Sequence, residues 1–197
     1  MNKTRLEAFS DGVFAIVITL LILDIRLPEV DYAHLGQALR DILPRILSYV
    51  LSFIVIGLYW IAHHNSFQLV SKTNRPFLWM NLFALLFISF IPFPTSLMGR
   101  YPYQTIPVMI YGLNLLAVNI IGFLMLTYIS RNPQLASPHF TKEIFRKKQV
   151  PMYICTNSFY VIAIILSPFV PVVSYCIYIL TIVLLIFLRE AKTGLAV

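Results

Sequence analysis

Six continuous apolar stretches dominate this 197-residue sequence, and each is long enough to cross a lipid bilayer as a helix. Hydrophobic residues make up 59% of the chain, charged residues only 12%, and the mean hydropathy is +0.81. The stretches do not alternate between apolar and polar residues, which favours helices over strands. The sequence therefore predicts an all-α, polytopic membrane protein, a six-transmembrane-helix bundle with spans at residues 6–25, 46–70, 77–98, 106–129, 151–168 and 170–188.

The lysines and arginines are concentrated on one side of such a bundle. With six spans, 11 of the 15 cations fall on the side that holds the N-terminus, the 71–76 loop, the 130–150 loop and the C-terminal tail. The positive-inside rule then places both termini in the cytoplasm of a multi-pass cell-membrane protein. The net charge of +7 indicates topology rather than nucleic-acid binding, and the basic 142–148 segment is expected among anionic lipid headgroups. Because no loop is long enough to carry a core of its own, residues 1–197 are expected to form a single transmembrane domain.

Polar side chains of three predicted spans lie at one depth in the membrane. The first span carries a carboxylate a few residues inside its first end, where a charge is costly unless it is paired or functional. This residue, Asp11, is expected to face the second and third spans of its own subunit, where an imidazole, an indole N–H or an amide would compensate its burial. Two interpretations of the cluster are open, a structural staple and a role in gating or pH sensing. Its candidate members are Ser10, Asp11, Trp60, His63, His64 and Asn81.

The same residues do not predict an enzyme or a metal site. His63 and His64 are adjacent, so they project about 100° apart on a helix and cannot easily share one ion. Ser10 and Asp11 are neighbours that point in different directions, with no sign of an oxyanion hole. Cys155 and Cys176 lie inside predicted spans and suggest neither a disulfide nor a metal. We therefore expect no catalytic residues, no metal and no cofactor.

An aliphatic seam runs along the other side of the first span. Ile16, Leu20 and Leu23 recur at helical spacing, and the hydroxyl of Thr19 lies beside them. Ordinary helix packing explains such a seam, but the polar side of this helix already faces its own subunit. Hydrophobic rings can gate a pore by dewetting, and rings of oxygen atoms can replace part of the hydration shell of an ion. Because one chain has only one such helix, a pore would need several subunits around an axis.

Two motifs resemble those of the transmembrane protein 175 family, the potassium channels of endosomes and lysosomes and their prokaryotic homologues. The first span contains Arg5-x-x-x-Phe9-Ser10-Asp11, which looks like the signature of that family. The second contains Trp60-Ile-Ala-His63-His64-Asn65-Ser-Phe67, which is similar to its second-helix pattern. A single unit of six spans matches the prokaryotic members.

The resemblance implies a potassium-selective channel that is a homotetramer in membrane lipid, with the first helices lining a central pore for potassium ions. No Thr-Val-Gly-Tyr-Gly filter string occurs in the chain. By the same resemblance, the constriction is formed by Ile16, Leu20 and Leu23, and Thr19 occupies the position linked to discrimination between potassium and sodium. The resemblance also adds Arg5 to the supporting polar network.

Two other functions compete with a channel. A cation-coupled secondary transporter would show broken helices and repeated halves, and the proline pairs in 92–94 and 168–171 are a faint sign of this. Proline at the end of a span is, however, usually a plain helix terminator. A membrane scaffold without conduction is the third possibility. Flux measurements separate the three, because a channel passes current, a transporter shows saturable coupled uptake, and a scaffold shows neither.

Overall fold

The computed structural model describes residues 2–138 and 140–193, with side chains up to Leu185 except that of Ile144. The predicted tail cations Arg189 and Lys192 therefore lie outside the described side chains. Apart from one antiparallel backbone bridge between Val70 and Ala136, the regular structure of the described residues is helical. The α-helices are α1 Lys3–Leu20, α2 Leu35–Asp41, α3 Leu43–Gln68, α4 Arg75–Phe90, α5 Pro92–Arg100, α6 Thr105–Arg131, α7 Lys142–Ile144, α8 Val150–Leu166 and α9 Pro171–Thr193.

Short helical turns complete the regular structure. Three of them are 3-10 turns at Leu21–Asp24, Tyr32–His34 and Pro133–Leu135, and a π-helical turn at Phe145–Gln149 leads into α8. The first of these continues α1, so that its helical path runs to Asp24.

The predicted all-α membrane fold is confirmed. The bounds of the helices differ from those of the six predicted spans. Five helical segments of the described chain are long and apolar enough to cross a membrane: Lys3–Asp24, Leu43–Gln68, Arg75–Arg100, Thr105–Arg131 and Phe145–Leu166. The apolar part of α9 that has described side chains, Pro171–Leu185, is shorter. The third of the five is not one helix, because α4 ends at Phe90 and α5 starts at Pro92, whose nitrogen has no hydrogen to donate.

Local sequence explains where several helices begin. Asn2 and Asn74 cap α1 and α4, accepting hydrogen bonds from the backbone amides of Thr4 at 3.3 Å and Phe77 at 3.1 Å. Proline occupies the first turn of α3, α4, α5, α8 and α9, where its missing amide hydrogen costs nothing.

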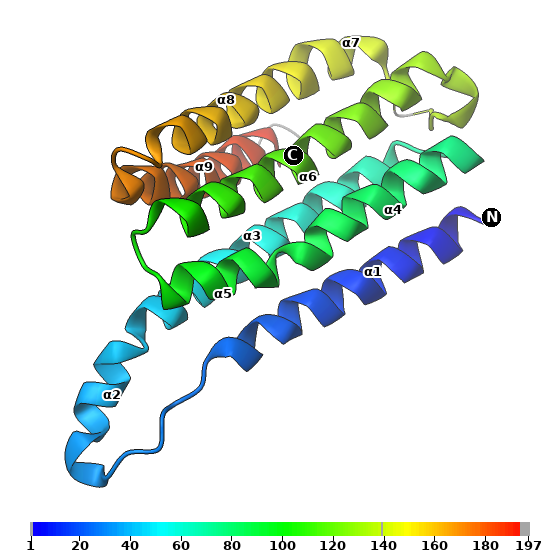
Figure 1. Cartoon of the computed structure of the whole chain (residues 1–197). Coiled ribbons are helices and arrows are strands. Elements are labelled where there is room, and N and C mark those ends of the chain that lie inside the picture. Colours follow the sequence, from blue (N-terminus) through cyan, green and yellow to red (C-terminus); the bar gives the residue numbers. More distant parts are fainter. Residues whose placement is uncertain (1, 139, 194–197) are drawn as a thin grey trace.

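Helix α6 lies within the bundle and α1 at its edge (Figure 1). α6 contacts α4, α5, α8 and α9, and it has the largest buried share of the five spanning segments. α1 contacts α3 and α4, with α5 reached only through the turn that follows it. In Figure 1, α1 (blue) flanks one side of the bundle and α8 and α9 (orange to red) the other. One long side of α1 is consequently exposed among the described residues.

Hydroxyl groups join the helices in the interior. Ser52 on α3 hydrogen bonds both Thr95 on α5 at 2.7 Å and Tyr111 on α6 at 3.1 Å. Tyr178 on α9 donates to the backbone carbonyl of Val108 at 3.0 Å. Such bonds satisfy buried polar groups that would otherwise be costly in an apolar bundle.

Candidate functional site

The two sides of α1 differ sharply in burial. Leu6, Ser10, Phe14, Val17 and Leu21 are buried against the bundle and follow one another at helical spacing. The residues of the aliphatic seam face away: Ile16 and Leu23 are each 60% exposed and Leu20 is 45% exposed. A side chain added at Gly12 would meet nothing within 4 Å, so the open strip extends toward the start of the helix. The seam predicted from the sequence is therefore an exposed face of the part of the chain that the structure describes.

Thr19 is exposed on the same open side of α1. Its hydroxyl donates back to the helix, with the carbonyl oxygens of Ile16 at 2.8 Å and Ala15 at 3.1 Å. Because the hydroxyl hydrogen is engaged within the helix, the oxygen presents its lone pairs outward as an acceptor. A hydroxyl oxygen whose hydrogen points into the helix can coordinate a cation through its outward lone pairs.

A buried chain of hydrogen bonds holds the other side of α1. The side-chain amide of Asn81 on α4 donates to the Ser10 hydroxyl oxygen at 3.0 Å, and Ser10 donates to the carbonyl of Leu6 at 2.9 Å. The Asn81 oxygen lies 2.8 Å from Nε2 of His63 on α3. Since a carbonyl oxygen only accepts, Nε2 is the nitrogen that carries hydrogen in this arrangement. Ser10, Asn81 and His63 thus link three helices in one chain of bonds.

Aromatic rings fix the His63 imidazole in place. Its ring stacks on Phe67 one turn later, with centroids 4.4 Å apart, and meets the edge of Phe14 on α1 at 5.5 Å. The imidazole therefore bridges α1 and α3 by ring contacts as well as by its bond to Asn81.

Asp11 lies outside that buried chain, which corrects the expectation that its carboxylate is buried. Its side chain is exposed in the described chain and accepts one hydrogen bond from the indole N–H of Trp60 at 2.9 Å. An indole donor on the second span was one of the three partners expected, so the direction of Asp11 toward α3 is confirmed. The reason for its exposure is that Ser10, one residue earlier, takes the buried direction of the helix.

Two other residues of the predicted network are not brought into it. Arg5 is exposed and makes no hydrogen bond or ion pair with the described residues. His64 bonds Gln68 on its own helix at 3.1 Å, and its ring lies 6.1 Å from that of Trp60. Adjacent residues of a helix point about 100° apart, and only His63 reaches Asn81. Among the described residues, no group of three or more His, Cys, Asp or Glu side chains could hold a metal ion.

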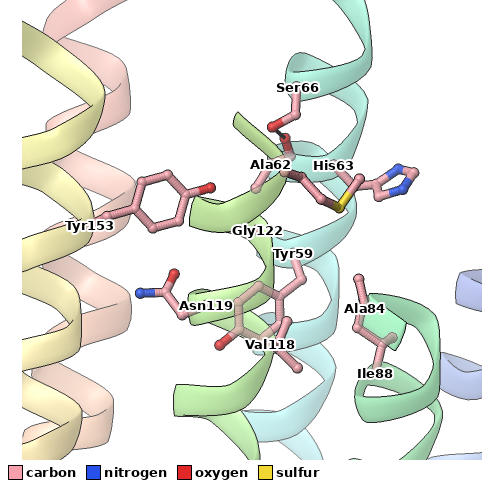
Figure 2. A pocket seen from close by; sticks show the side chains of 11 residues that line it. Tyr59, Ala62, His63, Ser66, Ala84, Ile88, Val118, Asn119, Gly122 and Tyr153 are labelled. Atoms are coloured by element: carbon pink, nitrogen blue, oxygen red, sulfur yellow. Dashed lines mark hydrogen bonds between the residues drawn. The ribbon is translucent and has the colours of Figure 1, made fainter. Parts of the chain in front are cut away.

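The site includes an internal cavity that sequence reasoning missed. A cavity of about 60 Å³ lies between α3, α4, α6 and α8, and Figure 2 shows Tyr59, His63, Asn119 and Tyr153 among the side chains around it. Tyr59 donates to the carbonyl of Leu115 at 3.1 Å. Asn119 and Tyr153 belong to different predicted spans, and only the fold brings them to one place.

The turn that continues α1 at its C-terminal end is held by a separate contact. Asp24 accepts hydrogen bonds from Ser96 at 2.8 Å and from the Arg100 guanidinium at 2.9 Å, both on α5. In sequence, Asp24 and Arg100 are 76 residues apart, and nothing in their spacing predicts the pair. Helix α1 and the turn that continues it are thus attached to α4 through Ser10 and to α5 through Asp24.

Comparison with known proteins relates this geometry to a family. The family model described as endosomal/lysosomal potassium channel TMEM175 matches residues 5–92, which include α1, α3 and α4. A protein of Chryseobacterium sp. (strain P1-3) named potassium channel is 45% identical over 116 residues, or 59% of this chain and 59% of that protein. The human protein named endosomal/lysosomal proton channel TMEM175 is 41% identical over 114 residues, or 52% of this chain and 23% of that protein. The alignments thus span about half to three fifths of the bacterial relatives' length and under a quarter of the animal proteins' length.

A solved structure extends the likeness to nearly the whole chain. The crystal structure of a lysosomal potassium-selective channel TMEM175 homologue from Chamaesiphon minutus superposes with a TM-score of 0.81 at 30% sequence identity. The superposition covers 96% of this chain and 97% of the other. On the agreement of the family model, the sequence relatives and this structure, the chain belongs to the TMEM175 family.

Proposed function

We propose that this protein is a potassium-selective channel of the cell membrane, formed by four copies of the chain around a central pore. The bacterial relatives carry the name potassium channel, and the Chamaesiphon homologue is titled potassium-selective. In the proposed assembly, each chain is a single transmembrane domain of six spans and contributes α1 to the lining. By the distribution of lysine and arginine, both termini face the cytoplasm.

The open aliphatic face of α1 is the observation that carries the proposal. This face is exposed among the described residues, although it belongs to the helix that carries the family's first motif. The same face carries the Thr19 hydroxyl, and a pore lining can use such an oxygen to contact ions. Because each chain provides one such face, a closed ring of identical subunits is the simplest arrangement that shares it around an axis.

In the proposed pore, the aliphatic residues and the hydroxyl have different tasks. The passage is narrowed by Ile16, Leu20 and Leu23. A ring of hydrocarbon side chains at such a constriction can exclude water and so act as a gate. The ring of Thr19 oxygens adjoins the Ile16 layer, and its outward lone pairs replace part of the hydration shell. No metal or organic cofactor is required for this passage.

The polar residues behind the lining are proposed to keep it in register. Ser10, Asn81 and His63 hold the buried side of α1, and Trp60 holds Asp11 at the edge. Arg5 and His64 are assigned to the same supporting region from the family resemblance. A constriction lined by one helix from each subunit depends on such support, since a small shift of the helix changes the gap.

The test is ion flux through liposomes that contain only the purified protein. We expect a current whose reversal potential follows the potassium gradient, and Thr19→Val should reduce the preference for potassium over sodium. Ile16→Asn should raise conductance by wetting the narrow layer. Ile154→Asn on α8 is the matched control, because Ile154 is 59% exposed but lies away from α1, and it should leave the current unchanged. Saturable uptake coupled to a second ion would instead identify a transporter. Unaltered currents in Ile16→Asn would remove α1 from the lining.

A further inference from the structure

A pocket of about 510 Å³ is lined by residues of the loops that follow α3 and α6. These loops lie at the end of the bundle that carries the N-terminus (Figure 1). The pocket lies where the loop after α3 meets the loop after α6, and its polar lining consists of Ser71, Ser130, Ser137 and Lys142. We propose that this pocket binds a phosphate group, supplied either by the headgroup of a membrane lipid or by free phosphate. The proposal is independent of conduction and of the pore described above.

Backbone hydrogen bonds shape the pocket in advance. The amide of Ser71 donates to the carbonyl of Leu135 at 2.8 Å, and the amide of Ser137 donates to the carbonyl of Leu69 at 2.9 Å. These bonds join the two loops side by side, so the walls do not need to be ordered by a ligand. Preformed walls reduce the entropic cost of binding.

Three carbonyl acceptors beside the pocket are already engaged by side chains. The end of α6 would normally present free carbonyl oxygens and repel an anion. Here Ser130 donates to the carbonyl of Thr127 at 2.7 Å, and the Asn132 side chain donates to that of Tyr128 at 2.8 Å. The Ser71 hydroxyl donates to the carbonyl of Ala136 at 3.0 Å. The usual negative character of a helix end is therefore reduced on this side.

A buried hydroxyl of the lining is unused among the described residues. The Ser137 hydroxyl oxygen is buried and has no hydrogen-bond partner among the described residues. A buried hydroxyl without a partner is costly, and such groups commonly mark a bound water, ion or ligand. Because the neighbouring carbonyls are taken, a ligand that accepts hydrogen bonds is the partner that fits.

The charges around the pocket select an anion. Lys142 lines it, Lys72 follows Ser71, and Arg131 follows Ser130. Glu143 is the sole acidic residue between Ile42 and Arg189, and it is paired with Lys147 at 2.6 Å. A phosphate carries several strong acceptor oxygens, so it can accept hydrogen bonds from the ammonium group of Lys142 and the hydroxyl of Ser137 at once. A chloride ion has no such separate oxygen atoms. The apolar wall formed by Ile129 and Phe140 gives a lipid phosphate a place for its glycerol.

Calorimetric titration of the full chain in neutral detergent tests the proposal. The probes are dioctanoyl phosphatidic acid, inorganic phosphate, and dioctanoyl glycerol as the phosphate-free control. We expect phosphatidic acid to bind and dioctanoyl glycerol not to bind. Binding of inorganic phosphate as well would show that the phosphate alone is recognised, whereas its absence would identify a lipid as the source. Failure of both phosphate compounds to bind would overturn the proposal.

Variants locate the binding in the pocket. Lys142→Gln should weaken the affinity about tenfold and Ser137→Ala several-fold, because each removes a donor to a charged acceptor. Lys148→Gln is the matched control, since it removes the same charge from the exposed turn before α8 without lining the pocket. An equal loss in Lys148→Gln and Lys142→Gln would mean diffuse attraction to the basic surface, and unchanged binding in Ser137→Ala would remove that hydroxyl from the site. Either result refutes the assignment.

Discussion

Replacing Asn81 with alanine removes the residue that joins α1, α3 and α4 through its side chain. Asn81 is fully buried, donates to Ser10 at 3.0 Å and lies 2.8 Å from Nε2 of His63. The variant therefore loses two hydrogen bonds and leaves the imidazole N–H of His63 without an acceptor. It also leaves a small void behind α1.

The expected loss of stability follows from these contacts. Each hydrogen bond contributes about 0.5–1.5 kcal/mol, and a buried donor left unpaired costs about 1–3 kcal/mol. Interhelical hydrogen bonds within membranes average about 0.6 kcal/mol, which favours the lower part of these ranges. We therefore expect Asn81→Ala to lower the free energy of unfolding by about 2–4 kcal/mol, including a small cavity term.

Unfolding by SDS in mixed micelles, followed by tryptophan fluorescence at fixed protein concentration, measures this loss. Asn114→Ala is the matched control, because the Asn114 amide makes one bond, to the carbonyl of Phe87 at 3.0 Å, and its oxygen has no partner among the described residues. The control should lose about 1 kcal/mol or less. A double-mutant cycle with Ser10→Ala should give a coupling energy of at least about 0.5 kcal/mol. Equal losses in Asn81→Ala and Asn114→Ala, with no coupling to Ser10, would refute the chain of bonds as a support of α1.

Three further substitutions test the packing of the helices and the edge of the site. Gly112→Ala should destabilise the protein by about 2–4 kcal/mol in the same assay, because its methyl group would overlap the Tyr178 hydroxyl, a type of overpacking that typically costs 1–3 kcal/mol or more. Gly57→Ala should be neutral or stabilising, since the added methyl meets nothing within 4 Å, and similar losses in both glycine variants would contradict this account. Trp60→Phe should cost about 1 kcal/mol or less by circular dichroism, because its bond to Asp11 is exposed. A loss as large as that of Asn81→Ala would mean that the assembled protein buries this pair.

The sequence was sufficient to predict the helical membrane fold and the two-sided character of α1. Apolar length alone identifies spans, and helical spacing separates the Ile16 side from the Ser10 side. Asn81 was likewise predicted at the depth of Ser10, because both residues lie a few positions from the same end of the bundle. These predictions succeeded because they depend only on distances along a helix axis.

Rotation about the helix axis was harder to predict. His63 and His64 have the same depth and chemistry, so only the packing of α3 against α4 decides that His63 reaches Asn81. Asp11 was expected to be buried for its charge, yet Ser10 occupies the buried direction and Asp11 the edge. The pair of Asp24 and Arg100 joins segments far apart in sequence and has no local signal.

The paired loops after α3 and α6 also have a consequence for local motion. Surface loops usually exchange their amide hydrogens with solvent quickly, because their backbone bonds open easily. The amides of Ser71 and Ser137 instead bond across the junction of two long helices. In deuterium labelling, these two amides should therefore exchange as slowly as the amides at the adjoining helix ends. The two loops would then move together rather than independently.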